Sequence, residues 1–496
     1  MKNILFLFTD QLRYDAIGAN RNKFVQTPNL DALAADSVVF DYCLTPSAVC
    51  VPARLSLLSG RYPARTGCNA NNKQTKYPGD GLYGALTAAG LRSCNVGKMH
   101  NSRDLYGPMG FSERHTQEEM SNPLDDYTKF ILSSPYKNVF DYNGIRSEMY
   151  YVPQVSQLPA EAHPTQWVAD RSLDFLDSLK EGEKFFLFSS FIHPHPPFCP
   201  PAPWNKLYRR ESIPAPFVPE NYKDFKPMMT PSFDCENLGI TEKAAKRLKN
   251  YYSACVSFVD YQVGRIISAL KKKGLYDDTV IVFSSDHGEF LGDYSNFGKR
   301  SMLEPAVHVP LMMKIPGTAP CRRDDLCSLV DVAPTLMSLE GIGYADDEFD
   351  GIDLFSDTER EFVFSQYSHK GDGSYMIAGK DDKLIYSAAE KRYRYFNARP
   401  EVDDLYDAAD PRIAAMKEKL DAYYASDVGK VPDKDKETEK KKKAAKIKDF
   451  GTGWMDHTAR HAEEAARIPA PYLIDLPDVP AEEDLRTGEK EKKQGS

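Results

Sequence analysis

The sequence predicts an α/β fold with a large, mostly parallel sheet flanked by helices, because apolar strands alternate with helical patterns along most of the chain. The expected strands are short apolar runs at residues 3–8, 184–191, 279–284 and 309–315. The expected helices cover residues 28–37, 81–90, 165–179 and 242–274. Several strands end directly in polar residues, which predicts a site at the carboxyl edge of the sheet: Asp10, His193 and Asp286.

After about residue 354 the pattern changes to short strands followed by one helix. The expected strands lie at residues 360–367, 374–378, 383–387 and 393–397, and the helix at 411–424. This pattern predicts a small antiparallel sheet with one helix. We therefore expect a main α/β domain at 1–353, a small C-terminal α+β subdomain at 354–426 and a charged C-terminal extension at 427–496. The charge-dense extension indicates a solvated segment, and contact with a second copy of the chain is the alternative.

Composition limits the classes of partner and compartment. The 496 residues carry a formal net charge of -9, which argues against nucleic acid or an anionic membrane as the main partner. The nine cysteines form no CxxC pair, so free thiols in a reducing compartment are expected. The first apolar run is too short for a signal peptide, and no run approaches transmembrane length. These features predict a cytoplasmic protein.

The segment from Cys50 to Gly60, with the sequence CVPARLSLLSG, carries the first candidate site. A cysteine at a helix N-terminus lies in positive partial charge, which favours anions and activates sulfur. Arg54, one helical turn later, adds a fixed cation that suits a tetrahedral oxyanion. The segment resembles the C-x-P-x-R signature of the formylglycine-dependent (type I) sulfatases. In that family a maturation enzyme oxidises the cysteine to an aldehyde, whose hydrate is the nucleophile.

Two clusters at strand ends resemble the metal ligands of the same family: Asp10-Gln11, and Asp286-His287 within the sequence DHGE. The resemblance implies that Asp10, Gln11, Asp286 and His287 hold one divalent cation together with the modified Cys50. Calcium is expected, since hard cations prefer oxygen ligands. Manganese is the alternative, because Gln11 and His287 stand where many sulfatases carry Asp and Asn.

Three further segments resemble the elements of the family that handle sulfate: GKMH at 97–100, HPHP at 193–196 and FGK at 297–299. The resemblance implies that Lys98 and Lys299 bind sulfate oxygens. His195 would protonate the leaving oxygen, and His100 would take the proton that lets the hydrate expel sulfate. His193 would contact substrate or position its loop.

These segments follow the order of the family over residues 4–315, and the sequence DLYD at 404–407 resembles its C-terminal signature. The resemblance implies an alkaline phosphatase-like fold and a sulfuric ester hydrolase. Ala53 replaces the more frequent Ser of the signature. His308 stands where Arg is expected, and nothing in the sequence explains it.

The expected substrate is a sulfated carbohydrate or another small organic sulfate, and two loop residues are candidate contacts: Asn71 and Asn72. Phosphonate monoester and phosphodiester hydrolases of the same superfamily share the Asp-Gln and Asp-His forms, so they are the closest alternative. The GKMH element favours the sulfatase. A non-catalytic anion-binding protein, in which Cys50 stays a thiol, is the alternative from another class.

Overall fold

The computed structural model describes residues 1–71, 79–101, 105–120, 122–146, 150–208, 213–369 and 372–428. All of these residues belong to one compact unit. Apart from residues 427 and 428, the predicted extension lies outside the described residues, so its role stays a prediction.

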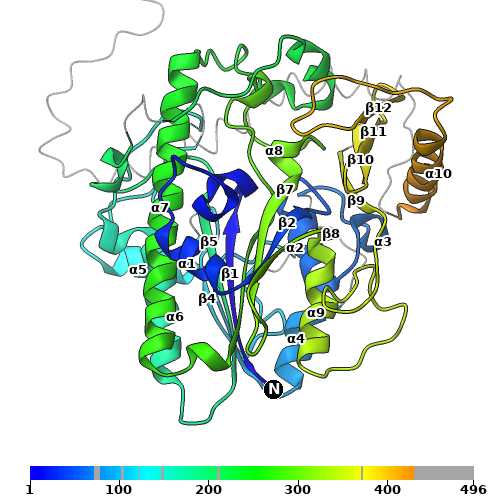
Figure 1. Ribbon diagram of the computed structural model, residues 1–496. Coiled ribbons are helices and arrows are strands. Elements are labelled where there is room, and N and C mark those ends of the chain that lie inside the picture. Colours follow the sequence, from blue (N-terminus) through cyan, green and yellow to red (C-terminus); the bar gives the residue numbers. More distant parts are fainter. Residues whose placement is uncertain are drawn as a thin grey trace, which may run out of the picture. The chain divides into compact units, whose positions relative to one another are not determined.

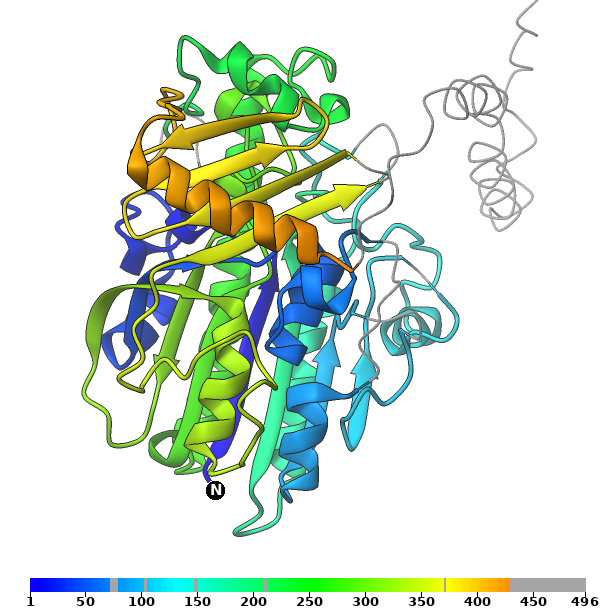
Figure 2. The same ribbon diagram turned by 90° about the vertical axis from the view of Figure 1, so that its right-hand side faces the viewer.

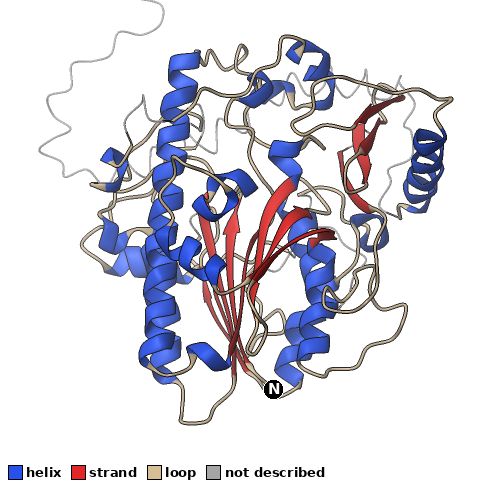
Figure 3. Ribbon diagram, in the orientation of Figure 1, coloured by secondary structure: helices blue, strands red, loops and turns tan. Residues whose placement is uncertain are grey.

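Within the described residues, one eight-stranded sheet has the order β4-β3-β5-β1-β6-β7-β2-β8 (Figures 1 and 3). Its strands are β1 (Asn3–Asp10), β2 (Val38–Leu44), β3 (Arg92–Gly97), β4 (Glu113–Thr116), β5 (Phe185–Pro194), β6 (Thr279–Ser285), β7 (His308–Lys314) and β8 (Cys321–Ser328). β7 runs antiparallel to both β6 and β2, whereas the other pairings are parallel. The predicted mixed, mostly parallel sheet is confirmed.

Helices cover both faces of this sheet (Figure 1). One face carries α1 (Pro28–Ala35), α5 (Asp126–Ser133), α6 (Pro164–Ser178) and α7 (Glu242–Lys272). The other face carries α2 (Cys50–Ser59), α4 (Gly81–Ala88) and α9 (Val332–Leu339). β1 alternates between these layers: Leu5 and Leu7 pack on the α6–α7 side, and Ile4, Phe6 and Phe8 on the α2–α4 side. Both faces of β1 are apolar because a parallel strand between two helical layers is buried on both sides.

The predicted small antiparallel sheet is also present (Figure 2). It consists of β9 (Val363–His369), β10 (Asp372–Ala378), β11 (Lys383–Ser387) and β12 (Arg392–Phe396), in the order β12-β11-β10-β9. The helix α10 (Pro411–Ser426) packs on it through Ile413, Met416 and Leu420, which meet Ile377 and Leu384. The domain limits at 353 and 426 stay a prediction.

Two short helices complete the set that bears on the site: α3 (Pro63–Thr66) and α8 (Glu304–Val307). None of the described helices has both the length and the apolar character that a membrane span requires. All nine cysteines lie within the described residues, and all are free thiols.

Candidate active site

The candidate site lies where three neighbouring parallel strands end. β1 pairs with β6 so that Thr9 is opposite Ser285, and with β5 so that Asp10 is opposite Pro194. The three polar residues predicted at strand ends, Asp10, His193 and Asp286, therefore lie at the same edge of the sheet, and His195 follows β5 there. The backbone N–H of Gln11 donates to Asp286 Oδ1 at 3.0 Å, which fixes the two strand ends to each other.

Cys50 is the first residue of α2 and follows Val49, which has extended backbone. Its Sγ lies 3.3 Å from His287 Nε2 and 3.8 Å from Asp10 Oδ1, and accepts a hydrogen bond from Lys299 Nζ at 3.0 Å. Burial alone would raise the pKa of this thiol, but Lys299, Lys98 and His287 lower it well below its usual value. The sulfur is therefore buried and lies beside positive charge that favours its thiolate form.

Four buried side chains offer ligand atoms that all lie within 4.8 Å of one another: Asp10, Cys50, Asp286 and His287. His287 Nδ1 lies 3.0 Å from the Gly288 carbonyl, which suits a tautomer that leaves Nε2 free as a ligand. Two buried carboxylates beside a nitrogen donor fit a divalent cation. These four residues are among the five predicted ligands. The fifth, Gln11, directs its side-chain oxygen to Lys299 Nζ at 2.8 Å.

Arg54 holds the two carboxylates together from the α2 side. Its Nε donates to Asp286 Oδ2 at 2.8 Å, and another nitrogen lies 3.2 Å from Asp10 Oδ2. The guanidinium also donates to the Lys98 carbonyl and to Ser190 Oγ, each at 3.1 Å. All of its contacts are buried, so Arg54 acts as a fixed counter-charge for both acids.

Lys98 and His100 follow β3, two strands away from β1 in the sheet. The Lys98 ammonium contacts both Asp10 and Glu119. His100 Nδ1 lies 3.4 Å from Glu119 Oε1. Burial and Lys98 lower the pKa of His100, but contacts with Cys50 and Glu119 outweigh them and raise it to about 9. Both predicted residues therefore face the cluster around Cys50.

His195 and Lys299 reach the same place from β5 and from the loop before α8. His195 Nδ1 lies 2.7 Å from the Pro196 carbonyl, so Nε2 is the nitrogen that faces Glu119, at 3.7 Å. Lys299 Nζ contacts Gln11, Cys50 and His287 within 3.1 Å. Five of the six predicted catalytic side chains thus surround the sixth, Cys50.

Three predicted substrate contacts have different outcomes. Asn71 lines a cavity together with His195 and Lys299, and its side-chain oxygen accepts from the Val51 N–H at 3.0 Å. Asn72 lies outside the described residues. His193 is buried against Thr165 and Cys199, at 3.1 and 3.5 Å. Its geometry favours the other role considered for it, which is to position the loop.

Sequence reasoning missed Glu119, which contacts Lys98, His100 and His195 with a single carboxylate oxygen. It also missed Arg146, whose guanidinium lies 2.7 Å from the other oxygen of that carboxylate. No motif marks either residue. Only their place on the loops that follow β4 and α5 brings them to the site.

The catalytic cluster opens into a cavity of about 200 Å³. Its described lining includes Gln11, Asn71, Glu119, Arg146, His195 and Arg300. A cavity of this size admits a small group such as a sulfate and the first part of its alcohol. It also gives access to Lys299, which lines the wall.

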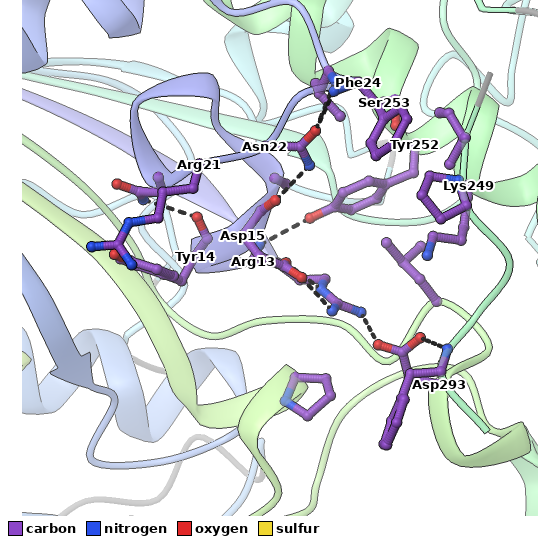
Figure 4. Close-up of a pocket in the computed structure, with 18 of the residues that line it drawn as sticks. Arg13, Tyr14, Asp15, Arg21, Asn22, Phe24, Lys249, Tyr252, Ser253 and Asp293 are labelled. Atoms are coloured by element: carbon purple, nitrogen blue, oxygen red, sulfur yellow. Dashed lines mark hydrogen bonds and ion pairs between the residues drawn. The ribbon is translucent and has the colours of Figure 1, made fainter. Parts of the chain in front are cut away.

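A second cavity of about 580 Å³ is lined by Arg13 and Tyr252 (Figure 4), which hold the backbone next to Gln11. The Tyr252 hydroxyl donates to the Gln11 carbonyl at 2.9 Å and accepts from the Arg13 N–H at 3.0 Å. Arg13 in turn pairs with Asp15 and Asp293, each at 2.7 Å. Among the described residues that line this cavity, none belongs to the predicted site. These contacts fix the backbone of a predicted metal ligand.

The chain is similar in sequence to sulfatases. The family profile described as Sulfatase matches residues 2–342. The arylsulfatase of Clostridium perfringens is 28% identical over 441 residues, which cover 81% of this chain and 89% of the relative. The choline-sulfatase of Rhizobium meliloti is 31% identical over 414 residues, 77% of each chain. Among solved structures, the phosphonate monoester hydrolase of Agrobacterium radiobacter matches with a TM-score of 0.72 and 23% identity, over 86% of this chain and 96% of that one.

Proposed function

The chain belongs to the sulfatase family and is a sulfuric ester hydrolase, and we propose that it cleaves sulfate esters of a carbohydrate or another small organic alcohol. The nucleophile would be residue 50, converted from cysteine to formylglycine. One observation carries the proposal. Lys98, His195 and Lys299, which come from three separate segments, enclose Cys50 beside a pair of buried carboxylates.

A divalent cation, calcium first and manganese as the alternative, would be held by Asp10, Gln11, Asp286, His287 and residue 50. When bound, it supplies positive charge that makes a hydroxyl at residue 50 acidic. The closeness of the two buried carboxylates supports this assignment, because burial and Asp10 raise the pKa of Asp286. A bound cation would lower the repulsion between the two negative charges and so stabilise both carboxylates in their ionised form.

The other side chains have roles that follow from where their polar atoms lie. The Lys98 and Lys299 ammonium groups would neutralise charge on the sulfuryl oxygens as it develops. His195 Nε2 would give its proton to the departing alcohol oxygen. His100 would accept the hydroxyl proton at residue 50 when sulfate leaves, so the carbonyl forms again and no water attacks sulfur. A maturation enzyme that oxidises Cys50 is the implied partner.

A phosphonate monoester or phosphodiester hydrolase is the second candidate. The match to such an enzyme has 23% identity and shows the fold alone. The sulfatase assignment is favoured by Lys98 and His100, which place a cation and a base against the cluster. Both residues suit a sulfuryl group that must be expelled from residue 50.

A substrate panel tests the proposal. The protein, produced together with a maturation enzyme, is given an aryl sulfate, a sugar sulfate, choline sulfate and a phenyl phosphonate ester. We expect turnover of at least one sulfate ester at a kcat/KM well above that for the phosphonate. Turnover of the phosphorus ester alone would replace this proposal by the second candidate.

A further inference from the structure

The cavity of about 200 Å³ that Lys299 and His195 line holds more positive than negative charge, and the sulfate group alone does not explain this excess. Lys299, Arg146 and Arg300 all line it. Among the described lining residues the one carboxylate is Glu119. Lys299 is engaged with Cys50, Gln11 and His287. Arg146 and Arg300 are therefore the two cations in this cavity to which the proposed reaction assigns no role.

Arg300 has no acidic partner among the described residues. Its guanidinium lies over the rings of Phe233 and Tyr367, 5.8 Å from each centroid. Its Nε is buried without a hydrogen-bond partner in the described part of the chain. Its backbone N–H donates to the Ala48 carbonyl at 3.1 Å, which ties the residue to the turn before α2. An arginine fixed in this way, with a buried donor unused, suits an anionic ligand.

Arg146 pairs with Glu119, and the Glu119 carboxylate lies among the groups that would bind the sulfate of a substrate. Its guanidinium lies 2.7 Å from Glu119 Oε2 and over the ring of Tyr150, 5.4 Å from the centroid. The other oxygen, Glu119 Oε1, contacts Lys98, His100 and His195. A carboxylate oxygen of Glu119 lies within 4.8 Å of the Cys50 sulfur.

These are the groups that the proposed function assigns to the sulfuryl oxygens and to the leaving oxygen. A sulfate that enters the site must therefore displace the Glu119 carboxylate. When Glu119 leaves, Arg146 loses its counter-charge. Only a fifth of the Arg146 side chain is exposed, so an unpaired charge there is costly.

We infer that Arg146 and Arg300 form a second anion subsite, and that the preferred substrates carry a carboxylate or a second sulfate close to the sulfate that is cleaved. This inference rests on the proposed function and narrows its substrate class. In the free protein, the Glu119 carboxylate stands in for one anion of such a substrate. The sulfate that is cleaved replaces the charge of Glu119, and the second anion pairs with the two arginines that then have no acidic partner among the described lining residues.

Matched aryl sulfates test the inference. The probes are 3-carboxyphenyl sulfate, the disulfate of benzene-1,3-diol and, as the neutral partner, 3-carbamoylphenyl sulfate. The readout is the ratio of kcat/KM for each dianion to kcat/KM for the carbamoyl ester. We expect this preference to be about tenfold or more for at least one dianion, since a half-buried charge-assisted hydrogen bond contributes that much. The two dianions show whether carboxylate or sulfate is favoured.

Variants assign the preference to the two arginines. Arg300→Met and Arg146→Met are each expected to lower this ratio by about tenfold relative to the wild-type protein. The intrinsic reactivity of each ester cancels when the ratio of the variant is divided by the ratio of the wild-type protein. Arg323→Met is the matched control, since Arg323 also lies over two rings, Phe40 at 5.5 Å and Phe355 at 5.8 Å, away from the site. Arg300→Gln serves if the methionine variant does not fold.

Binding to the full-length Cys50→Ala variant, measured by titration calorimetry with the same three esters, separates this inference from the proposed function. Hydrolysis of sulfate esters with no preference for a dianion, or a preference that survives both arginine variants, overturns the subsite and leaves the proposed reaction. Tighter binding of a dianion to Cys50→Ala without any hydrolysis by the mature protein supports the subsite and removes the proposed reaction.

Discussion

Replacement of Arg54 by methionine tests how the two buried acids are held. Arg54 is 2% exposed and pairs with Asp286 at 2.8 Å and Asp10 at 3.2 Å, both of which are fully buried. Methionine keeps much of the apolar stem but leaves two carboxylates without their fixed cation. Removal of one partner of a buried ion pair costs about 3–5 kcal/mol of unfolding free energy, so we expect a loss of that size for Arg54→Met without metal.

Calcium should raise the unfolding free energy of Arg54→Met by more than it raises that of the wild-type protein. A cation that binds only the folded state stabilises by about 2.7 kcal/mol at a hundredfold excess over its Kd. The variant site is more negative than the wild-type site and should therefore hold calcium more tightly. The difference between the two proteins is expected to shrink when calcium is added.

Urea unfolding followed by fluorescence, with EDTA or with calcium, measures both effects. Arg360→Met is the matched control, because Arg360 pairs with the buried Asp331 at 2.7 Å. Its loss of stability should be similar in size but unaffected by calcium. A loss below about 1 kcal/mol for Arg54→Met would refute the reasoning, because only exposed ion pairs contribute so little. A loss that calcium leaves unchanged would also refute it.

Three further predictions concern the reaction. His195→Asn should lower kcat/KM by about a hundredfold or more for sulfate esters of poor leaving groups, because these alcohols need a general acid to leave. The loss should be smaller for nitrophenyl sulfate, whose leaving group departs without a proton. Measurement over a series of leaving groups checks this, and an equal loss across the series would argue against a general acid at His195. In the unmodified protein Glu119 is one of the groups that raise the pKa of His100 to about 9, so Glu119→Gln should lower this pKa by about one unit or more. A histidine NMR titration of the protein with Cys50 unmodified measures the shift, and an unchanged pKa would contradict the contact between the two residues. Dialysis against EDTA should lower the unfolding temperature and abolish turnover, and added calcium or manganese should restore both. Full activity of a preparation that elemental analysis shows to contain no metal would contradict a catalytic cation.

The strands that carry the site were predictable because they are apolar runs that end in polar residues. β1, β5 and β6 are buried along their whole length, so the sequence signal is strong. β8 escaped prediction because five of its eight residues lie outside the core, and its sequence CRRDDLCS shows no apolar run. An edge strand of this kind is recognised only through its pairing with β2.

His308 illustrates a position that the sequence left without an explanation. Its ring stacks on Tyr14 at 3.8 Å between centroids and contacts the Asp41 carbonyl at 3.0 Å. Its other nitrogen lies 2.8 Å from Glu304. The residue therefore joins three segments in the fold and does not line the catalytic cavity.

The candidate site was predictable where short motifs fix several residues together, and not where single side chains come from loops. Cys50 and Arg54 lie on one helix, so their spacing already brings them to one face. Glu119 meets Lys98 and His195 only because three loops converge at the sheet edge. An isolated glutamate in a charged loop gives no sign of this in the sequence, since most such residues are solvated.

The most direct test of the account is mass spectrometry of the peptide that contains Cys50, from protein produced together with a maturation enzyme and shown to cleave a sulfate ester. We predict that residue 50 carries an aldehyde. Across preparations, the apparent kcat per total protein should rise in proportion to the fraction of chains that carry the aldehyde. A fully active preparation in which residue 50 is an unmodified thiol would contradict the account.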